Sequence, residues 1–276
     1  MQITAAEVNK LRHTTGAGMM DCKRALQEAN GDFDKAIEII REKGIAVANK
    51  RADKEAKEGV CLAKVNADAT KGAIITLNCE TDFVAINEKF LTFANAILDC
   101  ALTNLPADLE SFKNLKFNDK ATVAEAVTEQ VGIIGEKIEL NYYNKIEAPE
   151  VVAYIHMGNK LSTLVAFSKK VADHQVAKDV AMQVAAMSPI AVDKEDVPQD
   201  VADKELEIGR IQAKNEGKPE NMLDKIAMGK LSKFYKESTL LNQEFIKDSK
   251  QTIKQYLQNA DKELKVLKFI RYSLKD

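Results

Sequence analysis

Apolar residues in the first part of the chain recur at the spacing of helices. Thr4 and Glu7 form a capping-box sequence, in which the hydroxyl and the carboxylate satisfy free backbone N–H groups at a helix start. Val8 and Leu11 follow on one side of that helix. Two further segments repeat the spacing of three and four residues. They contain Cys22, Ala25, Leu26 and Ala29, and then Phe33, Ala36, Ile37 and Ile40. The pattern predicts three short helices.

Glycines are expected to mark the ends of these helices. Gly16 and Gly18 interrupt the pattern between the first two helices. Gly31 is suited to end the second helix and Asp32 to cap the third, while Gly44 is expected to stop it.

The next segment, residues 49–59, is rich in charged side chains and predicts a solvated linker or an exposed helix end. The apolar spacing then changes. Residues 60–67 and 73–77 flank a turn near 68–72, which predicts a β-hairpin with a longer loop. A long helix is expected through Phe90 and Ile97.

The remaining pattern predicts further helices and strands. A helix over 121–134 is closed by Gly135, and residues 138–146 are strand-like. Residues 151–156 and 161–167 predict two strands around a turn, followed by a helix over 173–187. Strand, turn, strand and helix thus recur at an offset of roughly 86–88 residues, which indicates two related α+β subdomains.

Between residues 189 and 228 the apolar stripes become narrow. Val201, Ile208 and Ile211 form one stripe, and Leu223, Ile226 and Ala227 form a second. The Gly217-Lys218-Pro219 segment separates them, which predicts an antiparallel helical hairpin. We therefore expect an α+β protein with four parts. They are an N-terminal module over 1–55, a first core subdomain over 56–147, a second over 148–188 and 229–276, and an inserted hairpin over 189–228.

Composition excludes several functional classes. The 276 residues carry a formal net charge of −2, whereas a nucleic-acid-binding domain is usually clearly basic. Aromatic residues make up 6% and Trp is absent, which argues against a base-stacking surface. We expect no direct nucleic-acid binding.

The cysteines and the chain's start indicate the compartment. The four cysteines form no C-x-x-C pair and no Cys-His cluster with zinc spacing, so we expect free thiols in a reducing compartment and no metal. The N-terminus lacks a signal-peptide pattern, and no apolar run approaches the roughly 18 residues of a membrane-spanning helix. We expect a cytoplasmic protein that does not bind membranes.

The segment NCETDFVAINEKF, residues 78–90, has two interpretations. Phe83, Ile86 and Phe90 lie at helical spacing, and this periodicity predicts that Phe83 belongs to the core. Asp82 would then be a helix cap or first-turn acid. Alternatively, the Asp82-Phe83 pair contacts another molecule.

Four segments resemble the elongation factor Ts family, the guanine-nucleotide exchange factors for the GTPase elongation factor Tu. They are LRHTTGAGMMDCKRAL (11–26), NCETDFVAINEKF (78–90), IHMG (155–158) and EGKPENMLDKIAMGKLSKFYKE (216–237). The resemblance implies a three-helix module like a ubiquitin-associated domain, two related α+β core subdomains and an inserted hairpin. It also implies binding to elongation factor Tu, no cofactor and no covalent chemistry.

The resemblance implies roles for particular residues. The tip that reaches toward the GTPase's magnesium site would comprise Thr81, Asp82, Phe83 and Val84. The N-terminal module would bind the GTPase through Leu11, Met19, Met20 and Lys23. Core contacts would come from Ile134, Gly135 and His156.

Other interpretations stay open from the residues alone. Met19 and Met20 suit either a core or an adaptable contact surface, and His156 on a predicted strand suits a structural histidine. A module that tethers a GTPase or ribosomal partner without speeding exchange is a second hypothesis. A hydrolase or redox enzyme is disfavoured because no nucleophile–base pattern or paired cysteines are present. Assembly as a homodimer, or of two copies with two GTPases, also stays open.

The sequence departs from the family pattern at three places. Ile86 stands where a basic residue is usual, so one contact is expected to be missing. Asn159 stands where the turn usually has Gly. The chain stops after FIRYSLKD, and we expect the contact that many relatives make through a C-terminal helix to be reduced or absent.

Overall fold

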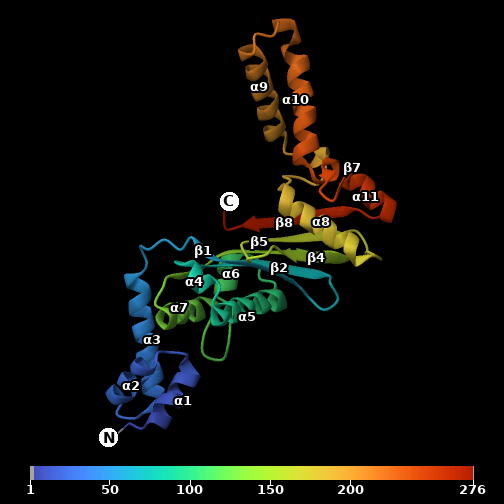
Figure 1. Cartoon of the computed structure of the whole chain (residues 1–276). Coiled ribbons are helices and arrows are strands. Elements are labelled where there is room, and N and C mark those ends of the chain that lie inside the picture. Colours follow the sequence, from blue (N-terminus) through green and yellow to red (C-terminus); the bar gives the residue numbers. More distant parts are fainter. Residues whose placement is uncertain (1–2, 276) are drawn as a thin grey trace. The chain divides into compact units, whose positions relative to one another are not determined.

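The computed structural model describes residues 3–275, and the chain divides into two compact units. Unit 1 comprises the residues up to Leu62, the segment Ala73–Asn144 and the residues from Ser273 on. Unit 2 comprises Ala63–Gly72 and Lys145–Tyr272. Each unit combines helices with a β-sheet, so the predicted α+β class is confirmed (Figure 1).

The chain begins with the three predicted helices, α1 (Ala5–Thr15), α2 (Met19–Glu28) and α3 (Phe33–Lys50). The capping box before α1 is confirmed, because the Glu7 N–H donates to Thr4 Oγ1 and the Thr4 N–H donates to Glu7 Oε2. Gly16 ends α1 with a φ of 71°, a left-handed conformation that suits glycine. The three helices enclose a small core whose buried members include Leu11, Cys22 and Leu26.

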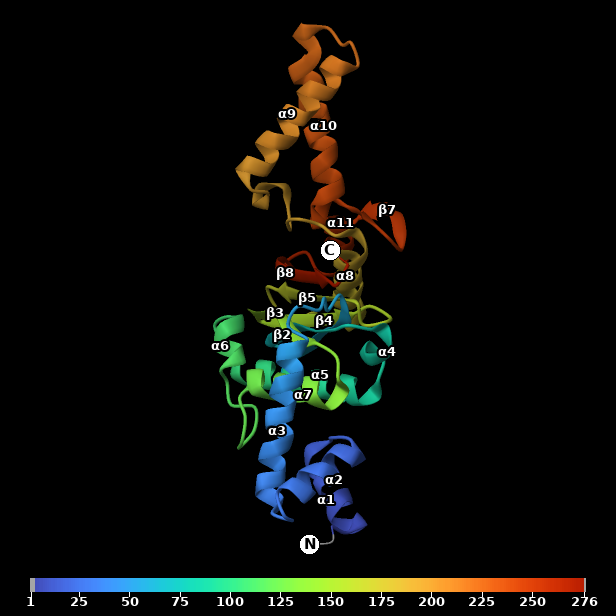
Figure 2. The same ribbon diagram turned by 90° about the vertical axis from the view of Figure 1, so that its left-hand side faces the viewer.

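The prediction that Gly44 stops the third helix is wrong, because α3 continues through it to Lys50. Gly44 is buried, and its backbone lies against Gly132 of α7 (Val123–Ile134). The glycine permits a close approach of two helices instead of a helix end. Figure 2 shows α3 as one continuous helix that reaches from α1 and α2 to α7.

The rest of unit 1 is built on a three-stranded sheet. Its strands are β1 (Glu58–Val65), β2 (Lys71–Cys79) and β3 (Ile138–Glu147), in the order β1-β2-β3. Helices α5 (Glu88–Asn104) and α7 lie on one face of the sheet, and the short helices α4 (Asp82–Ala85) and α6 (Leu109–Lys113) connect the larger elements (Figures 1 and 2). The core between sheet and helices contains alternate β2 residues, including Ile75 and Leu77, with Phe90 and Ile97 of α5.

Unit 2 contains a second three-stranded sheet in the order β4-β5-β8. The strands are β4 (Glu150–Ile155), β5 (Leu161–Phe167) and β8 (Val266–Ser273), and α8 (His174–Met187) packs on β4 and β5. β4 and β5 are antiparallel, with Val152 opposite Val165. In both sheets the third strand lies beside the second strand of the preceding pair.

The turn between β4 and β5 accommodates the departure at Asn159. Gly158 and Asn159 both have a positive φ, of 89° and 56°. Asn is among the few non-glycine residues that adopt this left-handed region readily. The turn therefore keeps a tight geometry without the glycine of the family pattern, and His156 and Asn159 close it with a backbone hydrogen bond.

The predicted helical hairpin consists of α9 (Gln199–Asn215) and α10 (Leu223–Ser238), which lie side by side in Figures 1 and 2. α10 runs past the boundary expected at 228. The buried positions are mostly small, including Ala202, Gly209 and Ala213 of α9 and Ala227 of α10. Ile208 and Ile211, which the stripe pattern placed at the contact, are exposed, because Gly209 brings the backbones too close for large side chains between them.

Unit 2 also contains several short elements and a buried carboxylate that joins some of its segments. The elements are η1 (Lys194–Asp196), η2 (Glu220–Met222), η3 (Leu240–Asn242), β6 (Glu244–Phe245), β7 (Asp248–Thr252) and α11 (Ile253–Ala260). Asp179 of α8 accepts hydrogen bonds from Gln175, Lys247 and Tyr256 at 2.6–2.9 Å. Asp179 therefore ties α8 to the loop after β6 and to α11.

Within residues 3–275, all four cysteines are free thiols, and three of them are buried. No helix of this described part of the chain combines the length and apolarity that crossing a membrane requires. Nor do the described residues bring together three or more His, Cys, Asp or Glu side chains in a group that could hold a metal ion.

Candidate functional site

The segment that raised two interpretations forms an exposed tip in unit 1. Thr81 caps α4, and its hydroxyl accepts a hydrogen bond from the Val84 N–H. α4 is only four residues long and ends at Ala85, which is buried. Asn87 then caps the separate helix α5. The tip thus projects Phe83 and Ile86 outward, with 78% and 73% of their surfaces exposed.

The prediction that Phe83 belongs to the core is therefore wrong. The spacing of Phe83, Ile86 and Phe90 suits one helix, but the chain changes direction at Asn87 and only Phe90 is buried. Of the two helical roles considered for Asp82, the structure shows the first-turn acid and not the cap, because Thr81 takes the cap position and Asp82 is an exposed residue of the first turn. An exposed acid and an exposed aromatic ring therefore stand side by side on α4.

The carboxylate of Glu136 holds the tip at its base. The Thr81 N–H donates to Glu136 Oε2 over 3.1 Å, and the Thr81 hydroxyl donates to Oε1 over 2.8 Å. Glu136 directly follows Gly135, which ends α7 with a φ of 83°. This bond pair joins the tip to the end of α7, so the segment with Ile134 and Gly135 lies beside Thr81.

A second carboxylate, Glu80, holds the same two segments together. The Lys137 N–H donates to Glu80 Oε1 over 2.6 Å, and Arg51 Nη1 lies 2.8 Å from Oε2. The backbone hydrogen bond from Lys137 holds the pKa of Glu80 below its ordinary value, with a smaller contribution in the same direction from Arg51. The charged form of Glu80 is thus part of the structure that supports the tip.

A groove of about 900 Å³ adjoins the tip within unit 1. Met19 lines it from the start of α2, Val84 from α4 and Ile134 from the end of α7. Phe93 of α5 adds a further apolar surface. Three residues that the sequence assigned to separate segments therefore share one concave surface. Arg12 and Lys89 place cationic side chains on the same lining.

The N-terminal module contributes two exposed methionines. Met19 and Met20 are 42% and 62% exposed at the first turn of α2, which excludes the core interpretation, and Lys23 is exposed one turn later. Leu11 is different. It is completely buried in the module's own core, so the structure does not support a direct contact between Leu11 and a partner. Its role is to pack the helices that carry the methionines.

His156 belongs to unit 2. The strand predicted to include it ends at Ile155, and His156 is an exposed turn residue between β4 and β5. Its Nδ1 lies 3.0 Å from the Tyr154 hydroxyl, so the side chain has a partner but is not buried. The adjoining Met157 is exposed as well. This turn is thus a second exposed site, and it belongs to unit 2, whereas the tip belongs to unit 1.

Sequence reasoning missed the residues that support the tip. Glu80, Arg51 and Glu136 contact the tip or its base, but nothing in their local sequence distinguishes them from solvated charges. Glu136 and Thr81 are far apart along the chain, and only the fold brings them together. Ile86 was identified as a departure from the family pattern, and the structure makes it a second exposed apolar side chain of the tip.

Comparisons with known proteins show which family the chain belongs to. The family model "Elongation factor TS" matches residues 80–276, beginning at the base of the tip. Elongation factor Ts of Christiangramia forsetii is 53% identical to this chain, with 99% of both chains covered. Those of Porphyromonas gingivalis and Amoebophilus asiaticus are 50% and 54% identical, with 99% and 98% of each chain covered. The chain therefore belongs to the elongation factor Ts family.

Proposed function

We propose that this protein binds elongation factor Tu and promotes release of its GDP, with Asp82 and Phe83 as the residues that disturb the nucleotide's magnesium and phosphate region. Family membership gives the chain a role in translation elongation as a factor that is not an enzyme. The finer mechanism rests on one observation, the exposure of Phe83 on a tip that two carboxylates hold in place.

The mechanism follows from differential binding. An exchange factor must bind the nucleotide-free GTPase more tightly than the loaded one, and this coupling is reciprocal, so the factor weakens nucleotide binding by the same ratio. Burying one Phe side chain stabilises a complex by roughly 1.5–3 kcal/mol. If Phe83 is buried only in the nucleotide-free complex, it loosens GDP by about ten- to hundredfold. A rigid tip is needed because a mobile one would lose conformational entropy on insertion.

The remaining contacts have separate proposed roles. Thr81 and Val84 hold and flank the inserted pair, and Met19, Met20 and Lys23 bind the GTPase from the N-terminal module. Ile134 and Gly135 extend the tip's surface, and His156 provides a contact from unit 2. The exposed apolar side chains suit a protein partner, and methionines adapt well to such surfaces.

The test is the release rate of fluorescent GDP from the cognate elongation factor Tu. It should be measured alone, with the intact protein, and with Asp82→Asn, Phe83→Ala and Phe83→Leu. We expect strong acceleration by the intact protein, a loss of about ten- to hundredfold in Phe83→Ala, and partial recovery in Phe83→Leu. Asp82→Asn should lower the rate if its charge acts near magnesium.

Ile208→Ala is the matched control, because it removes an exposed apolar side chain from the hairpin of unit 2. It should leave the GDP release rate unchanged. Binding of the intact protein without any acceleration would overturn the proposal and favour the tethering function. Acceleration that is equal in Phe83→Ala and the intact protein would keep exchange but exclude the tip as its cause.

A further inference from the structure

Helix α3 belongs to two hydrophobic cores within unit 1. Its first half packs into the core of the N-terminal module through Ala36, Ile37 and Ile40. Its second half packs against the core of the sheet and helices through Val47 and Ala48. Gly44 lies between the two halves, where α3 crosses α7. The module is therefore joined to the rest of unit 1 by a continuous helix.

The crossing of α3 and α7 is closer than ordinary side chains allow. A Cβ atom added to Gly132 would overlap the Cα atom of Gly44, and one added to Gly44 would lie 3.6 Å from the Cα of Gly132. The two glycines thus let the backbones touch. Replacement of Gly132 by Ala must move one helix away from the other, since the atom it meets belongs to the backbone and cannot rotate aside.

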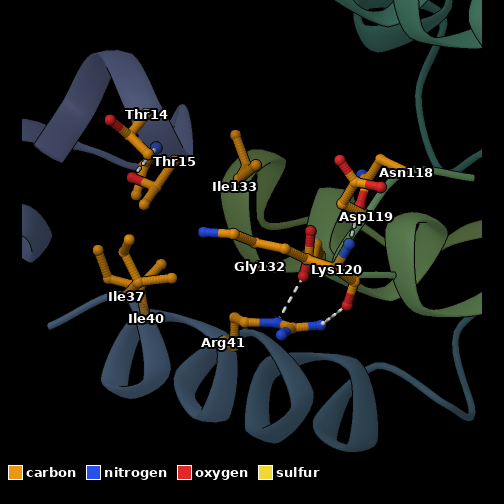
Figure 3. Close-up of a pocket in the computed structure, with 12 residues that line it drawn as sticks. Thr14, Thr15, Ile37, Ile40, Arg41, Asn118, Asp119, Lys120, Gly132 and Ile133 are labelled. Carbon is orange, nitrogen blue, oxygen red and sulfur yellow. Dashed lines mark hydrogen bonds and ion pairs between the residues drawn. The ribbon is translucent and has the colours of Figure 1, made fainter. Parts of the chain in front are cut away.

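A charged pair lies beside the glycine contact. Arg41 Nε is 2.6 Å from Glu129 Oε1, and Arg41 Nη2 donates to the Lys120 carbonyl oxygen over 3.3 Å. These two contacts hold α3 both to α7 and to the loop before it, and Figure 3 shows Arg41 beside Lys120 of that loop. Both side chains of the ion pair are about one-third exposed.

A cavity separates part of the module from α7 on the side of α1, although the turn after α1 approaches α7, where a Cβ on Gly16 would lie 3.5 Å from Ile133. A cavity of about 410 Å³ lies between Thr14 and Thr15 of α1, Ile37 of α3 and Ile133 of α7 (Figure 3). The groove described above continues this separation toward Met19. The direction of α3 at its crossing with α7 therefore contributes to where Met19 and Met20 lie relative to the tip.

We propose that Gly44, Gly132 and the Arg41–Glu129 pair are positioning residues, which set the module's methionines at the correct distance from Phe83 for simultaneous contact with the GTPase. This inference rests on the proposed exchange function. The helix amplifies small changes, because the eleven rises of 1.5 Å from Gly44 back to Phe33 add up to about 17 Å. A tilt of about 10° at the crossing moves that end of the helix by about 3 Å.

The first experiment measures the position of the module directly. Spin labels at Gln27→Cys on α2 and Asn95→Cys on α5, in a Cys100→Ser background, report the distance between module and core in the whole protein; both label positions are exposed. Gly132→Ala should shift or broaden that distance distribution. Gly229→Ala is the control, because it makes the same change in a helix where a new Cβ meets nothing within 4 Å. An unchanged distance in Gly132→Ala would overturn the inference.

The second experiment measures function with the same variants. Gly132→Ala should raise the concentration of protein that half-saturates GDP release by about tenfold, as loss of one strong interface contact does, while the maximal rate changes less than about twofold. The effect should disappear when Met19 and Met20 are both Ala, because the positioned groups are then absent. An equal effect of Gly132→Ala in both backgrounds would overturn the positioning role.

The ion pair gives an independent variant if Gly132→Ala folds poorly. Glu129→Arg should raise the half-saturating concentration, and the exchanged pair Arg41→Glu with Glu129→Arg should restore it. Absence of rescue would contradict a role for the pair. A different outcome would contradict the proposed function, namely an intact protein that does not accelerate GDP release. The positioning inference fails when the intact protein is active and Gly132→Ala matches it.

Discussion

Thr81 donates both its backbone N–H and its hydroxyl to the carboxylate of Glu136, over 3.1 and 2.8 Å. This pair of bonds connects the cap of α4 to the segment that follows α7. Since α4 is too short to be stable alone, the bonds to Glu136 and the buried Ala85 hold the tip in its conformation.

Removal of Glu136 should loosen the tip while the fold persists. We expect Glu136→Ala to reduce acceleration of GDP release by about three- to tenfold, because a charge-assisted hydrogen bond contributes about 1 kcal/mol or more to the ordered tip. Amide hydrogen exchange of Val84 and Ala85 should become faster in the same variant. Glu139→Ala is the control. It removes a carboxylate of β3 that forms an ion pair with Lys137. Unchanged exchange of both amides would contradict the bracing role.

The tip's support should weaken in acid through Glu80. Its folded-state pKa lies below the ordinary carboxyl value of 4.5, so the unfolded chain binds this proton more readily than the folded one. The stabilisation is thus fully present above the ordinary value and is lost as pH falls through the lower folded pKa. Glu80→Gln should therefore be less stable at neutral pH and show a flatter stability profile below about pH 4.5. Denaturant unfolding at several pH values measures this, and parallel profiles would refute it.

The buried carboxylate of unit 2 should be important for stability. Burial opposes the charge of Asp179, but hydrogen bonds from Lys247, Gln175 and Tyr256 outweigh it and lower the pKa of Asp179. Burial, with Asp179 beside it, raises the pKa of Tyr256 to about 12. Asp179→Ala should destabilise the protein by about 2–4 kcal/mol, because it leaves buried partners unpaired.

Denaturant unfolding of Asp179→Ala and of Asp203→Ala separates this effect from loss of any aspartate. Asp203 is exposed, and its carboxylate accepts a hydrogen bond from Gln199 of the same helix. The Asp203 variant should change stability by less than about 0.5 kcal/mol. Equal losses of unfolding free energy in the two variants would show that the hydrogen bonds of Asp179 do not stabilise the protein.

Two glycines in the helices of the hairpin, Gly209 and Gly229, should respond in opposite ways to larger side chains. Gly229 of α10 faces open space, so Gly229→Ala should stabilise its helix by about 0.5–1 kcal/mol. A Cβ on Gly209 would lie 3.1 Å from the Cα of Ala227, so Gly209→Leu should separate the helices. Amide hydrogen exchange along α9 and α10 measures both changes. Equal protection in the two variants would exclude close packing at Gly209.

The β4–β5 turn should tolerate glycine but not a β-branched residue. Asn159 has a φ of 56°, which glycine adopts freely and valine does not. Asn159→Gly should change stability by only a few tenths of a kcal/mol, and Asn159→Val should cost about 1–2 kcal/mol. Thermal unfolding of the two variants compares these costs. A Val variant as stable as the Gly variant would mean that the turn can change its backbone conformation.

Local signals predicted much of the fold. The capping box of Thr4 and Glu7 and the glycine after α7 act within one helical turn, so their sequence pattern suffices to place helix ends. The same rule wrongly predicted a helix end at Gly44. Its role depends on Gly132 of a distant helix, and no local pattern distinguishes a helix stop from a close crossing.

The candidate site shows a similar division. Helical spacing placed Phe83 in the core because a spacing pattern does not show that a new helix begins after Asn87. Only the family resemblance indicated that Phe83 is exposed. Neither signal assigned a supporting role to Glu136, or to Glu80 within the segment 78–90, since the partners of these carboxylates are set by tertiary contacts. Met19, Val84 and Ile134 were identified individually, whereas their shared groove required the fold.

The exposure of Phe83 has a consequence for natural variation. A side chain that contributes almost nothing to the hydrophobic core is not retained by selection for folding, so mutations at this position would accumulate freely in a protein that only had to fold. The residue found at position 83 in different lineages should therefore follow changes in the surface of the partner. Ala85, two residues away and buried, should vary independently of the partner.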